Sequence, residues 1–300
     1  MDGLKVQVLN VGKKRFVWGE RTYVMGIINL TEDSFSGDGL LSGLPGTEDY
    51  IQSALKQGRA FVEAGVDILD IGGESTRPGS TPTPMEQELK RVAPVVKALA
   101  AESDVMISVD TYKSQVAEAA LEAGAHMVND VWGFHADPDL ARVVARYKAP
   151  VILMHNRSSW AHAEIKGKLG GRYIGMAYEN LIEDICRELM ESVQLAREAG
   201  IPDEHIILDP GIGFGKTVEQ NLELLDRLAE IRTLGFPVLL GPSRKSFIGF
   251  TLDLPPAERA EGTAAAVAIG IARGADIVRV HDIPAMVRVA RMSDAIVRRR

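Results

Sequence analysis

Residues 68–110 read ILDIGGESTRPGSTPTPMEQELKRVAPVVKALAAESDVMISVD. The segment begins and ends with short runs rich in Val, Ile and Leu, at Ile68–Gly72 and Met106–Asp110. Between these runs, residues 84–101 carry apolar side chains at the spacing of an amphipathic helix. A strand, a helix and a second strand in this order are typical of a parallel sheet with crossover helices. The segment therefore predicts an α/β fold.

The same unit recurs along the chain. Strand-like runs lie at 23–29, 68–72, 106–110, 127–130, 150–155, 206–209, 237–241 and 277–281. Each precedes a stretch of helical period, at 50–64, 84–101, 114–123, 138–147, 173–199, 218–234, 256–272 and 284–297. Eight such repeats in 300 residues fit a TIM-type (β/α)8 barrel, usually about 250 residues long, better than a doubly wound sheet of five or six strands. We therefore expect the barrel.

The N-terminal residues predict a hairpin. Apolar residues alternate imperfectly with polar ones across residues 4–22, around a turn at Gly12 and the two lysines that follow it. We expect residues 1–22 to form a β-hairpin that caps the bottom of the barrel. Because residues 1–300 contain no linker, low-complexity stretch or long charge run, we expect a single domain.

The composition is that of a folded globular protein, with 46% hydrophobic and 25% charged residues. The formal net charge of −7 argues against a general nucleic-acid binder. The single cysteine, Cys186, excludes an intrachain disulfide and favours a reducing compartment. The start lacks the pattern of a signal peptide, and the most apolar stretch, residues 263–272, is too short to span a bilayer. We expect no nucleic-acid partner, no membrane and a cytoplasmic location.

Polar residues gather at the predicted carboxyl ends of the strands, the end that carries the catalytic residues of a β/α barrel. They are Asn29, Asp70, Glu74, Asp110, Asn129, Asp130, His155, Asp209, Lys245, Arg279, His281 and Asp282. Any one of them could serve only as a cap for the next helix. Their accumulation at one end of the barrel favours an active site there.

The first kind of polar group accepts hydrogen bonds. Asp110, Asp209 and Asn129 suit a heterocycle with adjacent N–H donors, because a carboxylate accepts two parallel hydrogen bonds. This pattern predicts recognition of a guanidine-like ring edge. The alternative is a structural or supporting carboxylate, satisfied by backbone amides. We expect that role for Asp70, Asp130 and Asp282.

The second kind is cationic and consists of Arg77, Lys245, Arg279 and His281, with Arg244 as a further candidate. Arg279 and His281 stand two positions apart on one predicted strand, so their side chains point to the same side. An arginine holds phosphate through two parallel hydrogen bonds. Because several cationic groups meet at this end, a phosphate or pyrophosphate site is favoured over a core ion pair of Arg279 with a carboxylate.

Three loops are unusual. Residues 209–217, DPGIGFGKT, do not form a P-loop, because Pro210 stands where that motif has glycine, and their glycine spacing does not match the dinucleotide fingerprint. We expect a flexible loop that brings Phe214 close to a flat ligand. Residues 31–45 and 74–84 are long for barrel loops and predict lids that exclude water.

Together these segments resemble the dihydropteroate synthase family. The resemblance rests on residues 25–31, 33–36, 70–79, 108–111, 128–130, 208–211, 213–216, 243–246 and 279–282. Residues 74–79 and 243–246 are the most specific, because pterin-binding barrels of the corrinoid methyltransferase type resemble the family in fold and in the acidic pterin residues but not there.

The resemblance implies a transferase of folate biosynthesis and a sulfonamide target. Such an enzyme condenses 6-hydroxymethyl-7,8-dihydropterin pyrophosphate with 4-aminobenzoate, giving 7,8-dihydropteroate and pyrophosphate. The resemblance also implies Mg2+ as cofactor, held through Asn29, and a homodimer formed by late helices around residues 258–273.

The resemblance further distributes roles over single residues. Catalysis falls to Asp110, Lys245, Arg279 and His281. The pterin would contact Asp110, Asn129, Met154, Asp209, Phe214, Gly241 and Lys245. The pyrophosphate would contact Asn29, Arg279 and His281. The 4-aminobenzoate would contact Phe35, Thr76, Arg77, Pro78 and Ser246.

The first loop departs from the family pattern. The family usually has proline where Glu32 stands, and Gly37 lies in this loop as if one residue were added. This departure motivates one alternative, a degenerate pterin-binding paralogue without turnover. A second alternative is a Schiff-base aldolase with Lys245 as the nucleophile, which would leave the acceptors Asp110, Asn129 and Asp209 unused.

Overall fold

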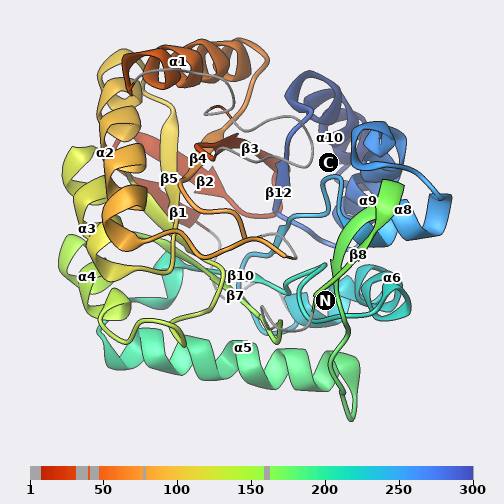
Figure 1. Ribbon diagram of the computed structural model, residues 1–300. Coiled ribbons are helices and arrows are strands. Elements are labelled where there is room, and N and C mark those ends of the chain that lie inside the picture. The colour runs from red at the N-terminus through yellow and green to blue at the C-terminus, as the bar shows by residue number, and fades with distance from the viewer. Residues whose placement is uncertain (1–7, 32–39, 41–46, 77–78, 159–162, 300) are drawn as a thin grey trace.

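Eight parallel strands form a nearly closed barrel at the centre of the computed structural model (Figure 1). The structure describes residues 8–31, 40, 47–76, 79–158 and 163–299. The barrel strands are β3 (Tyr23–Asn29), β4 (Ile68–Gly72), β5 (Met106–Asp110), β6 (Met127–Asp130), β7 (Val151–Met154), β10 (Ile206–Asp209), β11 (Leu239–Leu240) and β12 (Ile277–Val280). A bridge between Leu208 and Val238 joins the two ends of the sheet. The predicted TIM-type (β/α)8 barrel is confirmed.

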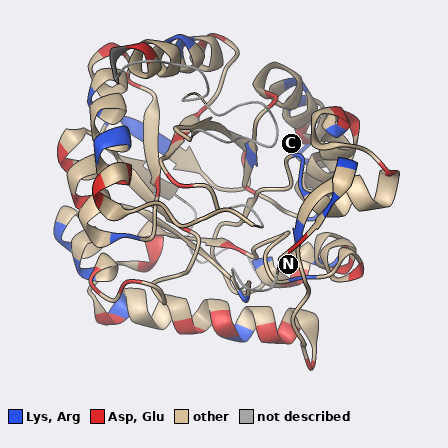
Figure 2. Cartoon of the chain, viewed as in Figure 1, with Lys and Arg blue, Asp and Glu red and all other residues tan. Residues whose placement is uncertain are grey.

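Helices surround the barrel and cover its outer face (Figure 1). They are α1 (Thr47–Glu63), α2 (Met85–Glu102), α3 (Ser114–Ala123), α4 (Leu140–Tyr147), α5 (Leu181–Glu198), α6 (Val218–Asp226), α7 (Leu228–Arg232), α8 (Ser246–Leu252), α9 (Ala260–Ala272) and α10 (Ile283–Val297). Figure 2 shows acidic and basic residues close together on these outer helices, for example along α5. Among the described residues, no helix is long and apolar enough to cross a membrane.

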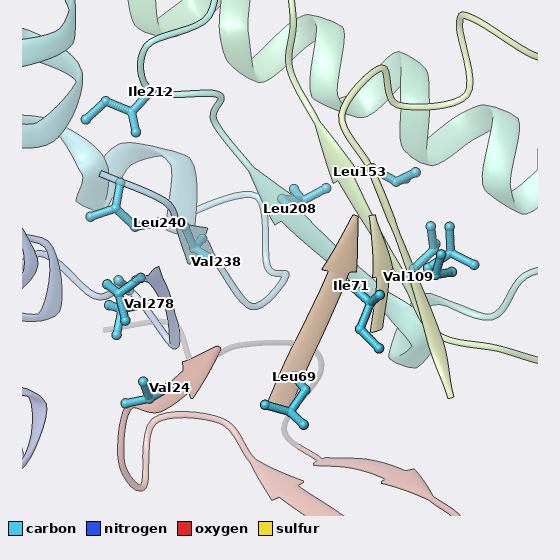
Figure 3. Close-up of a cluster of buried hydrophobic side chains, with 14 of the residues drawn as sticks. Val24, Leu69, Ile71, Val109, Leu153, Leu208, Ile212, Val238, Leu240 and Val278 are labelled. Atoms are coloured by element: carbon cyan, nitrogen blue, oxygen red, sulfur yellow. The ribbon is translucent and has the colours of Figure 1, made fainter. Parts of the chain in front are cut away.

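The outer face of the barrel strands is apolar and packs against the helices. Because side chains alternate across a strand, every second residue points away from the barrel axis. Figure 3 shows part of this buried cluster, including Val24, Leu69, Ile71, Val109, Leu153, Leu208, Leu240 and Val278. Burying each such side chain contributes roughly 1.5–3 kcal/mol, so this layer is the main source of the barrel's stability.

Residues that point into the barrel change from apolar to polar along the strands. The layer nearest the bottom consists of Met25, Ile68, Met106, Met127, Ile152, Ile207, Leu239 and Ile277. Two positions further along their strands stand Asp70, Ser108, Asn129, Asp209 and Arg279. These residues share the inward face, since side chains alternate. The barrel therefore carries its polar residues above an apolar base, toward the carboxyl ends of the strands.

The N-terminal hairpin closes the apolar end of the barrel. Strands β1 (Val8–Val11) and β2 (Lys14–Val17) pair antiparallel. Leu9 and Trp18 lie in the same buried cluster as the apolar bottom layer, and the ring of Trp18 meets that of Tyr23 edge-on with centroids 5.6 Å apart. The predicted hairpin and its position at the barrel bottom are confirmed.

Truncating the side chain of Trp18 tests how much the N-terminal hairpin contributes to stability. We expect Trp18→Ala to lower the free energy of unfolding by about 3–5 kcal/mol, because a ring that is 6% exposed would leave a cavity. Ligand affinity at the opposite, polar end should be unchanged. Urea denaturation measures the first quantity and calorimetric titration the second. A stability loss below about 1 kcal/mol, typical of a surface substitution, would contradict the packing role.

The predicted helix at 173–199 is wrong at its start. A second hairpin, of β8 (Ala163–Lys166) and β9 (Gly170–Tyr173), precedes α5, which begins only at Leu181. The turn between these strands includes η1 (Gly167–Leu169), and Gly170 adopts a φ of 68°, which glycine tolerates better than other residues. Within the predicted helix, Gly175 was a local signal against a helical start.

Helices and strands in the last third of the chain are also shorter or more interrupted than predicted. The helical stretch 218–234 breaks at Arg227 into α6 and α7, and 256–272 begins with the short turn η3 (Pro256–Glu258) before α9. Helix α8 was not predicted at all. The strand predicted at 237–241 is reduced to Leu239–Leu240, and Pro237 at its predicted start has no N–H to donate to a neighbouring strand.

Candidate functional site

One pocket at the carboxyl ends of the strands brings together the described residues that the sequence predicted for the site. They are Asn29, Thr76, Asp110, Asn129, Met154, Asp209, Phe214, Gly241, Lys245, Ser246, Arg279 and His281. Phe35, Arg77 and Pro78 lie outside the described residues, as do Glu32 and Gly37 of the first loop.

Arg279 joins two carboxylates at the centre of the pocket. Its Nε lies 2.6 Å from Oδ2 of Asp70, and its Nη2 lies 2.5 Å from Oδ2 of Asp110. The side-chain amide of Asn129 donates to the same oxygen of Asp70 at 3.1 Å. The ion pair of Arg279 with a core carboxylate, which the sequence favoured less than a phosphate site, is therefore present, because β4 and β5 turn their inward carboxylates toward β12. Asp70 has the supporting role that was predicted.

The electrostatics of Arg279, Asp70 and Asp110 favour a charged arginine beside a carboxyl group, that of Asp110, which titrates near neutral pH. Burial alone lowers the pKa of Arg279, but the charges of Asp70 and Asp110 raise it by more. Burial raises the pKa of Asp110 to about 7, against the opposing effect of Arg279. A carboxyl group with such a pKa in a pocket is characteristic of a functional site.

A second pair of charged groups, Asp209 and Lys245, lines the pocket next to Arg279, since a Cβ at Gly241 would lie 4.0 Å from Nζ of Lys245 and 3.7 Å from Cβ of Arg279. Oδ1 of Asp209 accepts from the backbone N–H of Gly211 at 2.7 Å, and burial raises the pKa of this carboxyl while Lys245 lowers it. Lys245 donates to the carbonyl of Ile212, and its Nζ lies 4.4 Å from the centre of the Phe214 ring. Enclosure lowers the pKa of Lys245 to about 8. The pair can bind a flat, polar heterocycle above Phe214.

The segment that follows β11 contacts the residues that follow β12. His281 Nδ1 lies 2.9 Å from Oγ of Ser243. Arg244 adopts a φ of 54°, a conformation that costs energy in any residue other than glycine, and it pairs with Asp282 at 2.6 Å. Asp282 therefore has the supporting role that was predicted. Asp130 has one as well, because it accepts backbone N–H groups of two residues that follow it.

A buried lysine, Lys216, holds the glycine-rich loop of residues 209–217 in place. Gly211 has a φ of 68°, and a Cβ there would lie 1.8 Å from the carbonyl oxygen of His155, so no other residue fits. Lys216 Nζ donates to the carbonyls of Gly211 and Phe214 at 2.9 and 3.1 Å, and lies 3.0 Å from Nδ1 of His155. Burial lowers the pKa of Lys216 to about 7. The loop that carries Phe214 is thus tied to the barrel.

Removing this tie should destabilise the protein. We expect Lys216→Met to lower the free energy of unfolding by about 2–4 kcal/mol, because two buried carbonyls lose their donor. Lys97→Met, at an exposed position of α2, is the matched control and should change little. Equal unfolding free energies for the two variants in urea would show that the loop does not depend on Lys216.

The second loop is tied at its base by an ion-pair cluster that the sequence did not reveal. Glu74 accepts from the backbone N–H of Thr83 and the hydroxyl of Tyr112, both at 3.0 Å. Lys113 bridges Glu74 and Glu88, the latter at 2.5 Å. These partners are far apart in the chain, so no local pattern marks them.

Several residues that line the pocket were not predicted to belong to the site. They include Leu169, Gly170, Gly171, Tyr173, Pro256 and Arg259. The first four belong to the hairpin of β8 and β9, which was not predicted: residues 156–172 were assigned to no element, and Tyr173 was placed at the start of a helix. Arg259 is 2% exposed and donates to the carbonyl of Leu169, which attaches that hairpin to the barrel.

Comparison with known proteins gives the class first. The family described as "Pterin binding enzyme" matches residues 25–281, which span all eight barrel strands apart from the first two residues of β3. A barrel with this pocket is therefore a pterin-binding enzyme. Curated dihydropteroate synthases of Clostridium beijerinckii and Bacillus subtilis are 49% and 46% identical to this chain, each covering 97% of it and 100% and 94% of their own length.

Solved structures agree with these relatives. A Clostridium difficile dihydropteroate synthase, solved in the presence of pteroic acid, is 45% identical with a TM-score of 0.84, over 95% of this chain and 100% of its own. A Xanthomonas albilineans dihydropteroate synthase with 4-aminobenzoic acid is 38% identical with a TM-score of 0.84, over 97% and 98%. The chain belongs to the dihydropteroate synthase family, the transferases that make dihydropteroate in folate biosynthesis. The predicted resemblance is confirmed, and the aldolase alternative loses its support.

Proposed function

We propose that this pocket holds 6-hydroxymethyl-7,8-dihydropterin pyrophosphate and 4-aminobenzoate together and joins them with loss of pyrophosphate. The observation that carries this proposal is that one pocket holds buried hydrogen-bond acceptors together with cationic groups. The ion-paired Arg279 lies on β12 and His281 directly follows that strand, and the carboxylate of Asp209 lies in the same pocket with Lys245 and Phe214. A substrate with a hydrogen-bond-donating ring at one end and an anion at the other fits this combination.

The pterin lies on the acceptor side. Its ring edge donates to Asp209 and Asn129, which are 5% and 3% exposed and therefore bind without competition from much water. Lys245 and Asp110 contact the ring from the pocket walls. The apolar contacts come from Met154, Phe214 and Gly241, all of which line the pocket.

The pyrophosphate lies on the cationic side, against Arg279 and His281. Mg2+ fits here as a partner of the phosphate oxygens, because it keeps several waters and uses few protein ligands. The described residues contain no group of three His, Cys, Asp or Glu side chains that would hold a metal alone. Asn29 at the end of β3 would supply its side-chain oxygen, and the ion would supply positive charge near the leaving group.

The 4-aminobenzoate lies beside the second loop, against Thr76 and Ser246. Both line the pocket, and Ser246 directly follows Lys245, which places the amine side next to the pterin side. We extend this side to Phe35, Arg77 and Pro78 by the family resemblance.

The reaction is a substitution at the pterin methylene carbon. The carbon–oxygen bond breaks, its electron pair leaves with the pyrophosphate, and the cationic groups stabilise the departing anion. The carboxylate of Asp110 stabilises the cation that remains on the pterin. The neutral nitrogen of 4-aminobenzoate then attacks and releases a proton, without need of a general base. If pyrophosphate were never released in the absence of 4-aminobenzoate, this order of steps would be wrong.

The proposal predicts a bell-shaped pH profile of kcat/KM for the pterin substrate. Asp110, whose pKa is raised to about 7, must be ionised, so activity falls as the pH drops through that value. Lys245, whose pKa is lowered to about 8, must be protonated, so activity also falls as the pH rises through that value. Lys245→Arg keeps the charge and should move the alkaline limb upward. An alkaline limb that stays in place in this variant would contradict the role of Lys245.

Product formation tests the function itself. The full chain is given the dihydropterin pyrophosphate, labelled 4-aminobenzoate and Mg2+, beside Lys245→Ala and Arg279→Ala prepared in the same way. We expect labelled dihydropteroate from the unaltered protein and almost none from either variant. Pterin binding without any product would favour the degenerate paralogue instead.

We also propose a homodimer formed by the late helices around residues 258–273. The exposed side chain of Ile269 on α9 and that of Met292 on α10, 47% and 63% exposed, support this choice. Small-angle scattering of a monomer at micromolar concentration would contradict it. The single domain, the cytoplasmic location and the absence of a nucleic-acid partner stay predictions.

A further inference from the structure

The hairpin of β8 and β9 forms one wall of the pocket. It is inserted between β7 and α5, and Figure 1 shows it beside α8 and α9. Leu169, Gly170, Gly171 and Tyr173 of this hairpin line the pocket. The hairpin therefore contributes directly to the shape of the space that a substrate occupies.

Several contacts hold the hairpin against the C-terminal part of the barrel. The guanidinium of Arg259 donates to the carbonyl of Leu169 at 2.8 Å. The side chain of Arg172 lies over the ring of Phe250 on α8, 4.5 Å from its centre. Nζ of Lys166 on β8 lies 5.7 Å from the centre of the same ring, so anchors on both strands fix the hairpin relative to α8.

Tyr173 is the residue through which the hairpin meets the substrate-binding groups. Its side chain is 5% exposed, and its ring stacks on that of Phe214 with centroids 6.0 Å apart and planes inclined by 29°. Its hydroxyl donates to the backbone carbonyl of Thr76 at 2.8 Å. Burial raises the pKa of this hydroxyl to about 12, so it remains a donor at neutral pH. Tyr173 thus connects the loop of Phe214 with the second loop.

We infer that Tyr173 determines the specificity for the aromatic amine, by closing the 4-aminobenzoate side of the pocket to the width of one unsubstituted ring. The inference rests on the proposed function, in which Thr76 belongs to that side. An aromatic ring between Phe214 and the second loop offers a flat surface to a benzene ring, and we expect it to restrict the space for groups added to that ring. A hairpin that served only stability would not need a pocket-lining aromatic residue.

The pterin side should be insensitive to this residue. The Phe214 ring also lies under Nζ of Lys245, and its backbone carbonyl is held by Lys216. These contacts remain when Tyr173 is truncated, so Phe214 keeps its position. The two substrates should therefore respond differently, which separates a specificity role from general damage to the fold.

Steady-state kinetics of the full chain test the inference with Tyr173→Ala and Tyr173→Phe. Ile174→Ala, at the next position and 52% exposed, is the matched control. For Tyr173→Ala we expect the KM for 4-aminobenzoate to rise about tenfold or more, with the KM for the pterin substrate within about twofold. Tyr173→Phe, which keeps the ring and loses the hydrogen bond, should raise the first KM only about threefold.

A second measurement addresses selectivity. The unaltered protein should prefer 4-aminobenzoate over 4-amino-3-methylbenzoate in kcat/KM, and Tyr173→Ala should reduce this preference about tenfold, as expected when a pocket gains room for a methyl group. Equal KM changes for both substrates, or an unchanged preference, would overturn the inference. If the unaltered protein itself formed no dihydropteroate, the proposed function would fail instead, so the two failures are distinguishable.

Discussion

Replacing Arg279 by methionine should lower kcat/KM about 1000-fold or more, the largest loss expected from a single change in the pocket. The guanidinium stabilises the charge of the departing pyrophosphate, and removing one such preorganised group typically costs about 100- to 1000-fold in rate. Here the loss is larger, because Asp70 and Asp110 would also lose their partner and repel the anion. The rate of product formation is measured at saturating and at subsaturating concentrations of both substrates, which separates kcat from KM.

The same variant should be less stable. Asp110 would lose its ion pair and Asp70 would keep only the hydrogen bond from Asn129, which costs about 3–5 kcal/mol unless the carboxylates become protonated. The double variant Arg279→Met with Asp70→Asn removes one of those charges and should regain part of the unfolding free energy without regaining activity. Arg142→Met, an arginine whose side chain is 82% exposed on α4, is the control for loss of an arginine. Activity restored together with stability would mean that Arg279 is structural only.

Asp209→Asn should weaken pterin binding about 100- to 1000-fold. The amide oxygen of the new side chain can still accept from Gly211, as Oδ1 of Asp209 does at 2.7 Å, and its NH2 group then faces the pocket. That group meets the N–H donors of the pterin edge, and an unpaired donor pair in a buried site is strongly rejected. Stability should change little, because shape and backbone contact are kept.

Calorimetric titration with 6-hydroxymethylpterin measures the Kd directly. Asp139→Asn, where the side chain is 67% exposed, is the matched control and should bind the pterin as the unaltered protein does. An Asp209→Asn protein with an unchanged Kd would place the pterin elsewhere in the pocket. Urea denaturation of both variants excludes unfolding as the cause of a weaker affinity.

The barrel could be predicted from sequence because each strand repeats a simple pattern. Six of the eight barrel strands have the predicted bounds or differ by one residue, since strands such as Ile68–Gly72 and Met106–Asp110 are short apolar runs bounded by polar residues. Site residues at strand ends follow from topology, because inward residues beyond the apolar layer lie toward the same end of the barrel. Asp209 and Arg279 are of this kind.

What the sequence did not predict depends on contacts between distant segments. The pairing of Arg279 with Asp70 joins residues 209 positions apart, and no local pattern distinguishes a paired arginine from a free one. Tyr173 was assigned to a helix because its flanking apolar residues suited that period, whereas the hairpin is held by Arg259, far along the chain. Tertiary contacts of this kind override local preference.

A crystal structure with 6-hydroxymethylpterin pyrophosphate, an unreactive oxidised form of the substrate, tests the central claim most directly. The account predicts the ring edge within hydrogen-bond distance of Asp209 and Asn129, and the pyrophosphate against Arg279 and His281. A ligand in the opposite orientation, with its phosphates beside Asp209, would contradict the division of the pocket on which the proposed reaction depends.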